Sequence, residues 1–141
     1  MARIFWDTNV FIYLFEDNEK WSAPLRRFRQ NMVARRDELL TSHLTLGEVL
    51  TKPKQAGNSI LEKSYLSFFS NGPVELVPFE AEAAKRYAEI RSRHRVRPAD
   101  AIQLACAAAA RTDLFVTNDT RLSSLVVSGI TFITGIERMP Y

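Results

Sequence analysis

The chain has 141 residues, of which 46% are hydrophobic and 25% are charged, a composition that supports one well-buried core. It is too short for two ordinary domains, so we expect a single domain over residues 1–141. The single cysteine, Cys106, excludes an internal disulfide, and because no signal peptide and no membrane-length apolar run is seen, we expect a cytoplasmic protein without membrane contact.

The first predicted element is the apolar, aromatic run Arg3–Trp6, which indicates a buried strand and ends at Asp7. Two interpretations of Asp7 are open. It caps a helix that begins around Asn9, or it belongs to a site at the carboxyl end of the strand. The residue by itself does not separate these alternatives.

The middle of the chain alternates helical and extended patterns. Apolar residues recur at helical spacing in Ser22–Arg36 and in Ser59–Phe69. Leu39–Ser42 and Val74–Val77 are typical of strands, and Lys52–Asn58 is predicted to be a polar connection.

Glu48 lies in a predicted short helix, Leu44–Leu50, that follows the second strand. It stands about 6 Å along the axis from the helix start, which keeps it near the carboxyl edge of the sheet. Leu46, Val49 and Leu50 share one helical face and Glu48 points roughly opposite to them. A glutamate in that position, taken alone, favours solvent.

Asp100 opens a helix in which the only polar residues of Ala99–Ala110 are Asp100 and Gln103, and Pro98 suits its first turn. A first-turn aspartate stabilises a helix by interacting favourably with the helix dipole. A charge on so apolar a helix also needs a partner. Before this helix, the arginines of Arg91–Arg97 stand at every second position. That spacing does not form one helical stripe, and we expect a loop that leads toward Asp100.

The last predicted strand, Leu114–Thr117, ends two residues before Asp119. Considered alone, Asp119 is a turn former in Thr117–Thr120. The helix at Asp100 runs into this strand, so in a layered α/β fold it lies antiparallel to it. Its first turn then stands over the edge where Asp119 emerges.

The joint placement of the four acids predicts a divalent-metal site at the carboxyl edge of a parallel sheet, where such folds bind ligands. Carboxylates that converge within a few ångströms repel one another unless a cation is present, and no run of lysines or arginines lies beside them. An all-oxygen set suits Mg²⁺ or Mn²⁺, and no Cys/His spacing indicates zinc. The residues are Asp7, Glu48, Asp100 and Asp119.

Four segments in this order resemble the PIN-domain ribonucleases, most of all the single-domain toxins of VapBC-type toxin–antitoxin pairs. They are Asp7–Val10, Glu48–Val49, Pro98–Ala101 and Val116–Asp119. The resemblance spans most of the chain and implies a PIN-like three-layer α/β fold, with a central parallel β-sheet flanked by α-helices. It also implies a metal-dependent endoribonuclease.

Carried over by position, the resemblance implies that Asp7, Glu48, Asp100 and Asp119 are catalytic residues that hold Mg²⁺ or Mn²⁺. Asp7, Asp100 and Asp119 are the expected ligands, and Glu48 binds a second ion or positions the attacking water. The resemblance also implies a cognate antitoxin protein and a homodimer. The matching accessory polar positions are Asn9 and Thr117.

The charge balance favours RNA as the substrate. The chain carries 19 basic and 16 acidic residues, a net charge of +3 and a pI near 9.2, and arginine suits both phosphate contacts and stacking on unpaired bases. Arg93, Arg95 and Arg97 precede the predicted site and are RNA-contact candidates. The alternative is a solvated face with scattered ion pairs.

The expected reaction is attack of a metal-activated water on an RNA phosphodiester, which leaves 5′-phosphate and 3′-hydroxyl ends. Two other classes remain open. One is a PIN-like module that binds RNA or protein without cleaving it. The other is a Mg²⁺-dependent phosphoacceptor receiver domain, although its adjacent acidic pair and late-strand lysine are not seen.

Overall fold

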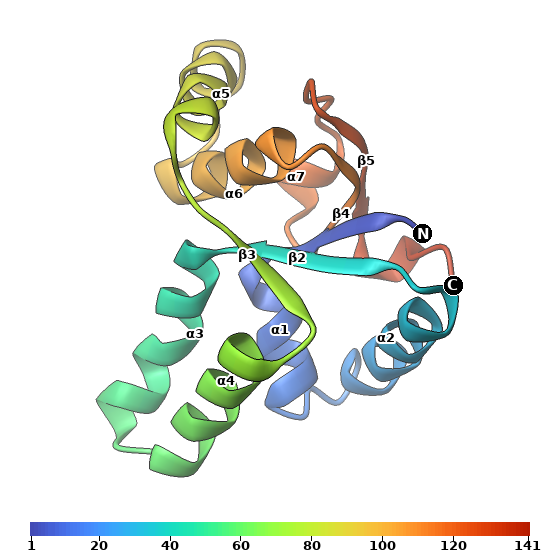
Figure 1. The fold of residues 1–141 in the computed structure, drawn as a ribbon, viewed down its shortest axis with the longest axis vertical. Coiled ribbons are helices and arrows are strands. Elements are labelled where there is room, and N and C mark those ends of the chain that lie inside the picture. Colours follow the sequence, from blue (N-terminus) through green and yellow to red (C-terminus); the bar gives the residue numbers. More distant parts are fainter.

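The computed structural model describes residues 1–141, and its centre is a sheet of five strands that are all parallel (Figure 1). The order across the sheet is β3-β2-β1-β4-β5. This is not the 2-1-3-4-5 order of receiver-type folds, so the receiver alternative is wrong. The strands are β1 (Arg3–Trp6), β2 (Glu38–Ser42), β3 (Val74–Val77), β4 (Thr112–Thr117) and β5 (Ile130–Gly135).

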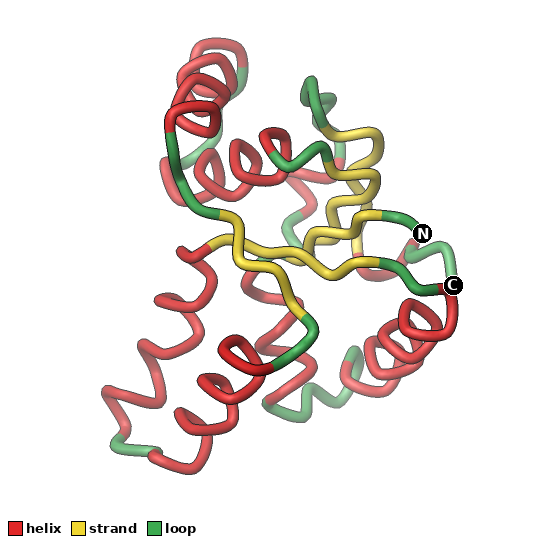
Figure 2. Tube along the Cα trace, in the orientation of Figure 1, coloured by secondary structure: helices red, strands yellow, loops and turns green.

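Helices cover both faces of this sheet and make three layers, as the ribbon of Figure 1 and the red helices and yellow strands of Figure 2 show. The predicted parallel α/β fold is therefore confirmed. One face carries α1 (Thr8–Phe15), α2 (Ser22–Arg35), α3 (His43–Ala56) and α4 (Ser59–Asn71). The other carries α5 (Ala81–Arg93), α6 (Pro98–Ala109) and α7 (Thr120–Ser123), and a 3-10 turn, η1 (Ile136–Arg138), follows β5.

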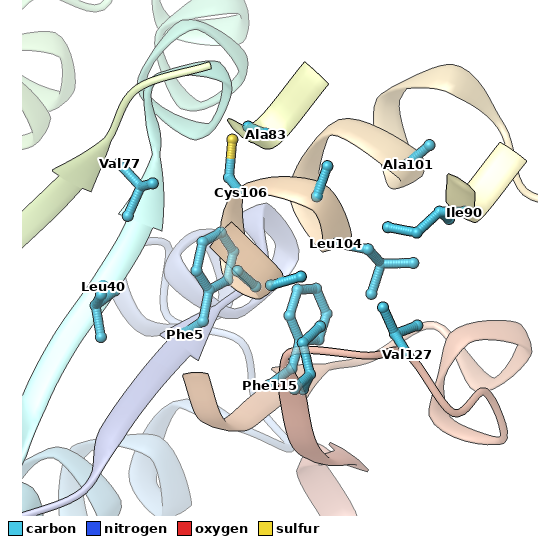
Figure 3. Close-up of a cluster of buried hydrophobic side chains, with 14 of the residues drawn as sticks. Phe5, Leu40, Val77, Ala83, Ile90, Ala101, Leu104, Cys106, Phe115 and Val127 are labelled. Carbon is cyan, nitrogen blue, oxygen red and sulfur yellow. The ribbon is translucent and has the colours of Figure 1, made fainter. Parts of the chain in front are cut away.

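The sheet separates two apolar cores, because successive side chains of a strand point to opposite faces. Ile4 and Trp6 of β1 face the α1–α4 layer, where the core is rich in aromatic rings, and Phe5 faces the α5–α7 layer. In the second core the small side chains of α6 let that helix lie close to the sheet, where Phe5 and Phe115 stack with their ring centroids 5.2 Å apart (Figure 3).

Cys106 lies in this second core, and its burial raises the pKa of the thiol to about 11. A thiol held protonated in this way packs as a small apolar group.

Two expected boundaries are wrong. Lys52–Asn58 is mostly helix, since α3 continues through the buried Pro53 and ends only where Gly57 adopts a left-handed φ of +66°. Arg91 and Arg93 belong to the last turn of α5 instead of a loop, because Ile90 continues the buried face of that helix. Only the segment after Arg93 leads to α6 as a loop.

No helix in the structure combines the length and the apolar character that crossing a bilayer requires.

Candidate active site

The order in which strands are added to the sheet reverses at β1: β2 and β3 lie on one side of it, and β4 and β5 on the other, although all five strands run parallel. In open α/β sheets, ligands bind at the carboxyl ends of the strands where this reversal occurs. Trp6 pairs with Val116 in the β1–β4 ladder, and the Asp7 amide continues it by donating to the Val116 carbonyl at 2.9 Å. Asp7 and Thr117 therefore emerge side by side at this edge.

Asp7 lies at the centre of the site and is only 7% exposed. Its Oδ2 accepts a hydrogen bond from the Thr117 hydroxyl at 2.7 Å, and its Oδ1 accepts from the Thr8 amide at 2.9 Å and from the Gln103 amide at 3.2 Å. Burial raises the pKa of Asp7 to about 6, helped by the charge of Asp100 and opposed by these three hydrogen bonds. The capping interpretation of Asp7 is confirmed, because the residue caps α1, and its role in a site at the carboxyl edge of the sheet stays a prediction.

Asp119 is paired with arginine. It caps α7 by accepting from the Arg121 amide at 2.9 Å, and the Arg121 guanidinium binds both of its carboxylate oxygens, at 3.1 and 2.7 Å. These hydrogen bonds from Arg121 lower the pKa of Asp119. The turn-forming interpretation of Asp119 is thus also correct, since the residue starts a short helix after β4.

Arg97 joins Asp119 to Asp100. Its Nε donates to Oδ2 of Asp100 at 3.3 Å, and its terminal nitrogen lies 3.8 Å from Oδ2 of Asp119. Asp100 itself lies in the first turn of α6, and it is close enough to Asp7 for its charge to raise the pKa of the Asp7 carboxyl. The sequence analysis assigned Arg97 to RNA contact and did not select Arg121, so it overlooked both as countercharges of the acids.

Glu48 is exposed on α3, as its position in the helix predicts, yet it is not free in solvent. The Thr8 hydroxyl donates to its Oε1 at 2.6 Å. Thr8 directly follows Asp7, so this contact ties Glu48 to the start of α1.

The accessory positions have different partners. Thr117 contacts a carboxylate, whereas Asn9 accepts a hydrogen bond from the Asn118 amide at 3.2 Å and thereby holds the turn after β4. Arg93 lies 4.0 Å from Glu89 on the exposed side of α5, and Arg95 is exposed in the following loop.

Gln103 is the residue of this site that the sequence analysis did not select. It is 2% exposed, and its amide contacts Asp7, Thr8, Ser42 and Thr45. The argument applied to Asp100 would have found it, because Gln103 is the other polar side chain of an apolar helix and lies one turn further along.

The donor set fits a divalent cation in its chemistry. Asp7 and Asp100 are two nearby carboxylates, and no cationic side chain contacts Asp7, so a hard ion would compensate a buried charge that the protein leaves uncompensated. The expected convergence of four carboxylates is not found, because no three acidic groups lie close enough to hold one ion. Arginines hold Asp119 and Asp100, and Thr8 holds Glu48.

Comparison with known proteins gives one family match: a model of the PIN domain matches residues 4–127. No curated protein matches the chain.

Solved structures with this fold are numerous. VapBC2 from Rickettsia felis, bound to a promoter DNA fragment, has a TM-score of 0.74 at 16% identity, covering 94% of this chain and 97% of that chain. DNA-bound VapBC from Salmonella typhimurium has a TM-score of 0.67 at 21% identity, with 96% and 99% covered. VapC20 from Mycobacterium tuberculosis, described as a toxin that cleaves the sarcin–ricin loop, has a TM-score of 0.63 at 18% identity, with 79% and 86% covered. At these identities the likeness shows the fold.

Proposed function

This chain belongs to the PIN domain family, and from that premise we propose that it is a Mg²⁺- or Mn²⁺-dependent endoribonuclease that acts as the toxin of a toxin–antitoxin pair. The substrate is RNA, and the reaction is hydrolysis of a phosphodiester bond.

The observation that carries this proposal is the pair of Asp7 and Asp100 beside the reversal point of the sheet. Asp7 is buried, faces a second carboxylate and has only neutral hydrogen-bond donors around it. A protein that used Asp7 only to cap a helix would have no reason to place another acid against it, because that arrangement raises the cost of ionising Asp7. A hard cation relieves this cost.

In the proposed site Asp7 and Asp100 hold the ion, Asp119 contributes through water, and Glu48 positions the attacking water or binds a second ion. A bound Mg²⁺ or Mn²⁺ supplies charge stabilisation and a lowered pKa of water. Thr117 and the Thr8 amide hold the Asp7 carboxylate in one orientation. Arg97 and Arg121, both more than 60% exposed, lie where they could contact the phosphate of a bound RNA.

The structural relatives support the antitoxin and the toxin activity, and the homodimer rests on the resemblance alone. The Salmonella and Rickettsia structures are of VapBC systems, and the M. tuberculosis protein is a toxin that cleaves an RNA loop. For this chain, the cognate antitoxin, the homodimer and a folded RNA target are therefore proposals. Expression of the protein alone should arrest growth, and purification from its native host should recover the antitoxin with it.

The test of catalysis is incubation of the purified protein with labelled structured RNA, with and without Mg²⁺ or Mn²⁺. We expect metal-dependent cuts with 5′-phosphate and 3′-hydroxyl ends, lost in Asp7→Ala and Asp100→Ala. Glu80→Gln removes a charge from an exposed acid at the start of α5 and serves as the matched control. A 2′,3′-cyclic phosphate, or cleavage that survives both alanine substitutions, rejects the proposal.

One observation favours a second candidate, a PIN-like module that binds RNA without cleaving it. Arg97 and Arg121 already compensate Asp100 and Asp119, and no three acids are gathered around one point. If the module interpretation holds, RNA binds equally well with and without Mn²⁺ and is recovered intact.

A further inference from the structure

We propose that Gln103 is the positioning residue of this site, and that it orients Asp7 directly and Glu48 through the hydroxyl of Thr8. The inference rests on the proposed function, which it deepens by assigning a residue that organises two of the acids at once. Gln103 itself touches neither Glu48 nor Asp100 through any hydrogen bond in the structure.

The surroundings of Gln103 are unusually polar for so buried a residue. Its Nε2 lies 3.2 Å from Oδ1 of Asp7, 3.0 Å from the Thr8 hydroxyl and 2.7 Å from the Thr45 hydroxyl. Its Oε1 accepts a hydrogen bond from the Ser42 hydroxyl. The side chain thus links α6 to the carboxyl ends of both β1 and β2.

The orientation of the Gln103 amide follows from its neighbours. An ionised carboxylate only accepts hydrogen bonds, so the amide nitrogen, and not the amide oxygen, must face Asp7. The oxygen then faces Ser42, which donates to it. Reversing the amide would place two acceptors against each other at Asp7.

This orientation also decides where the Thr8 proton goes. Thr8 has a single hydroxyl hydrogen, and the Gln103 nitrogen beside it is only a donor, so the Thr8 oxygen accepts from Gln103. Two acceptors for the hydrogen remain, the Thr45 hydroxyl at 3.1 Å and Oε1 of Glu48 at 2.6 Å, and the shorter bond to the carboxylate takes it. Glu48 is exposed on α3 and would sample many rotamers without this bond, and it is the bond from Thr8 that keeps it at the site.

Thr45 completes the arrangement from α3. Its hydroxyl oxygen lies 2.7 Å from Nε2 of Gln103, whose two hydrogens are shared among Thr45, Thr8 and Asp7. It also lies 2.8 Å from the Thr41 hydroxyl, which in turn donates to the Trp6 carbonyl at 2.8 Å. Thr45, Thr41 and Trp6 are all buried, at the end of β1 or β2 or in the first turn of α3. The amide of Gln103 is therefore held from several sides, as a group that orients others must be.

The alternative is that Gln103 only satisfies buried hydroxyls and so contributes stability alone. The two roles differ in what they predict for metal affinity. Loss of an orienting partner behind a metal ligand typically lowers affinity about 10- to 100-fold, whereas loss of a purely structural hydrogen bond elsewhere does not change it.

The experiment measures Mn²⁺ affinity by electron paramagnetic resonance, with thermal unfolding recorded in parallel. Gln103→Leu removes both the donor nitrogen and the acceptor oxygen of the amide and keeps a side chain of similar size. Thr8→Val removes only the hydroxyl that links Gln103 to Glu48, a connection called the Thr8 relay below, and Thr8→Ser keeps that hydroxyl. Thr112→Val is the matched control, because Thr112 is a buried threonine that donates to the Ala107 carbonyl at 2.8 Å at the other end of α6.

We expect Gln103→Leu and Thr8→Val each to lower Mn²⁺ affinity about tenfold. The double variant should lose less affinity than the product of the two single losses, because both substitutions break the same connection from Gln103 through Thr8 to Glu48. Thr8→Ser should retain the wild-type affinity, and Thr112→Val should lower the unfolding temperature alone. In steady-state cleavage, Gln103→Leu should reduce kcat more than it changes KM.

The inference is overturned if Gln103→Leu behaves like Thr112→Val, with a lower unfolding temperature and unchanged Mn²⁺ affinity. If Gln103→Leu does not fold, the partly exposed Thr8→Val decides, because an unchanged affinity there contradicts the Thr8 relay. Wild-type protein that binds Mn²⁺ but leaves RNA intact defeats the proposed function separately, and Gln103 is then judged on affinity alone. Wild-type protein that binds no Mn²⁺ defeats both.

Discussion

The hydroxyl of Thr117 donates a hydrogen bond to the carboxylate of Asp7 across 2.7 Å, although 110 positions separate the two residues in the chain. The contact exists because β1 and β4 are neighbouring parallel strands whose carboxyl ends meet at one edge. The Thr117 oxygen also accepts from the Asp119 amide at 3.0 Å, so one hydroxyl connects the first and the last of the four acids.

Thr117→Val should weaken catalysis by about 10- to 100-fold, as expected for the loss of a hydrogen bond that orients a metal ligand. The substitution keeps the shape of the side chain and removes the donor to Asp7. Thr117→Ser keeps the donor and should restore most of the activity. Rates of RNA cleavage at saturating Mn²⁺ measure this, and equal rates for the valine and serine variants would contradict it.

Asp7→Asn should stabilise the metal-free protein at neutral pH. The folded-state pKa of Asp7, about 6, lies above the usual 3.8 of an aspartate, so ionising the buried group costs stability, at most about 3 kcal/mol. The asparagine variant carries no such charge. Urea unfolding at pH 7.5 in the presence of a chelator compares the two proteins, and cleavage by the variant should be lost.

The same pKa predicts the pH dependence of this difference. Between about pH 4 and pH 6 the folded wild-type protein binds more protons at Asp7 than the unfolded chain does. The contribution of Asp7 to stability is therefore fully present below pH 4 and is lost as the pH rises through about 6. We expect the stability of wild type minus that of Asp7→Asn to fall over this window, measured without metal. A difference that rises with pH would refute the assignment.

Arg121→Gln should raise the affinity for Mn²⁺ by about twofold to fivefold, because it frees Asp119 from a paired but exposed guanidinium. The thermal unfolding temperature should hardly change. Arg27→Gln, on the exposed side of α2, makes the same change of charge away from the site and is the control. A lower Mn²⁺ affinity in Arg121→Gln would mean that the arginine supports the ion site.

Arg95→Gln should weaken RNA binding and reduce its salt dependence. Arg95 is exposed in the loop that leads from α5 to Asp100, so it is placed to contact a phosphate beside the site. One lost phosphate contact lowers the slope of log K against log salt by about 0.7 for single strands. Fluorescence anisotropy at several salt concentrations, with cleavage blocked by Asp7→Asn, measures the slope. An unchanged slope would remove Arg95 from the RNA surface.

Two glycines should respond to alanine in opposite directions. Gly129 has φ +98°, and an added Cβ would meet the Ala108 carbonyl of α6 at 2.7 Å, so Gly129→Ala should destabilise the fold by about 1–3 kcal/mol. Gly47 lies inside α3 with open space around it, so Gly47→Ala should stabilise by about 0.5–1 kcal/mol. Chemical denaturation of both variants tests the pair.

The fold was largely predictable because its elements follow local patterns. The apolar runs at Arg3–Trp6 and Leu114–Thr117 contain alternate residues for two cores, and the proline and alanines of α6 indicate a buried helix. The limits of α3 and α5 were not predictable in the same way. Pro53 is tolerated in α3 and Arg93 remains helical, because burial of neighbouring side chains decided those turns.

The sequence by itself determined that Asp7, Asp100 and Asp119 come to one edge of a parallel sheet, since strand direction and helix direction dictate where each element ends. Only the tertiary structure decided which groups these three acids and Glu48 contact. Arg121 binds Asp119, Thr8 holds Glu48, and Gln103 contacts Asp7 across 96 positions. Such contacts depend on side-chain rotamers and on the packing between layers. Neither of these produces a periodic pattern in the amino-acid sequence.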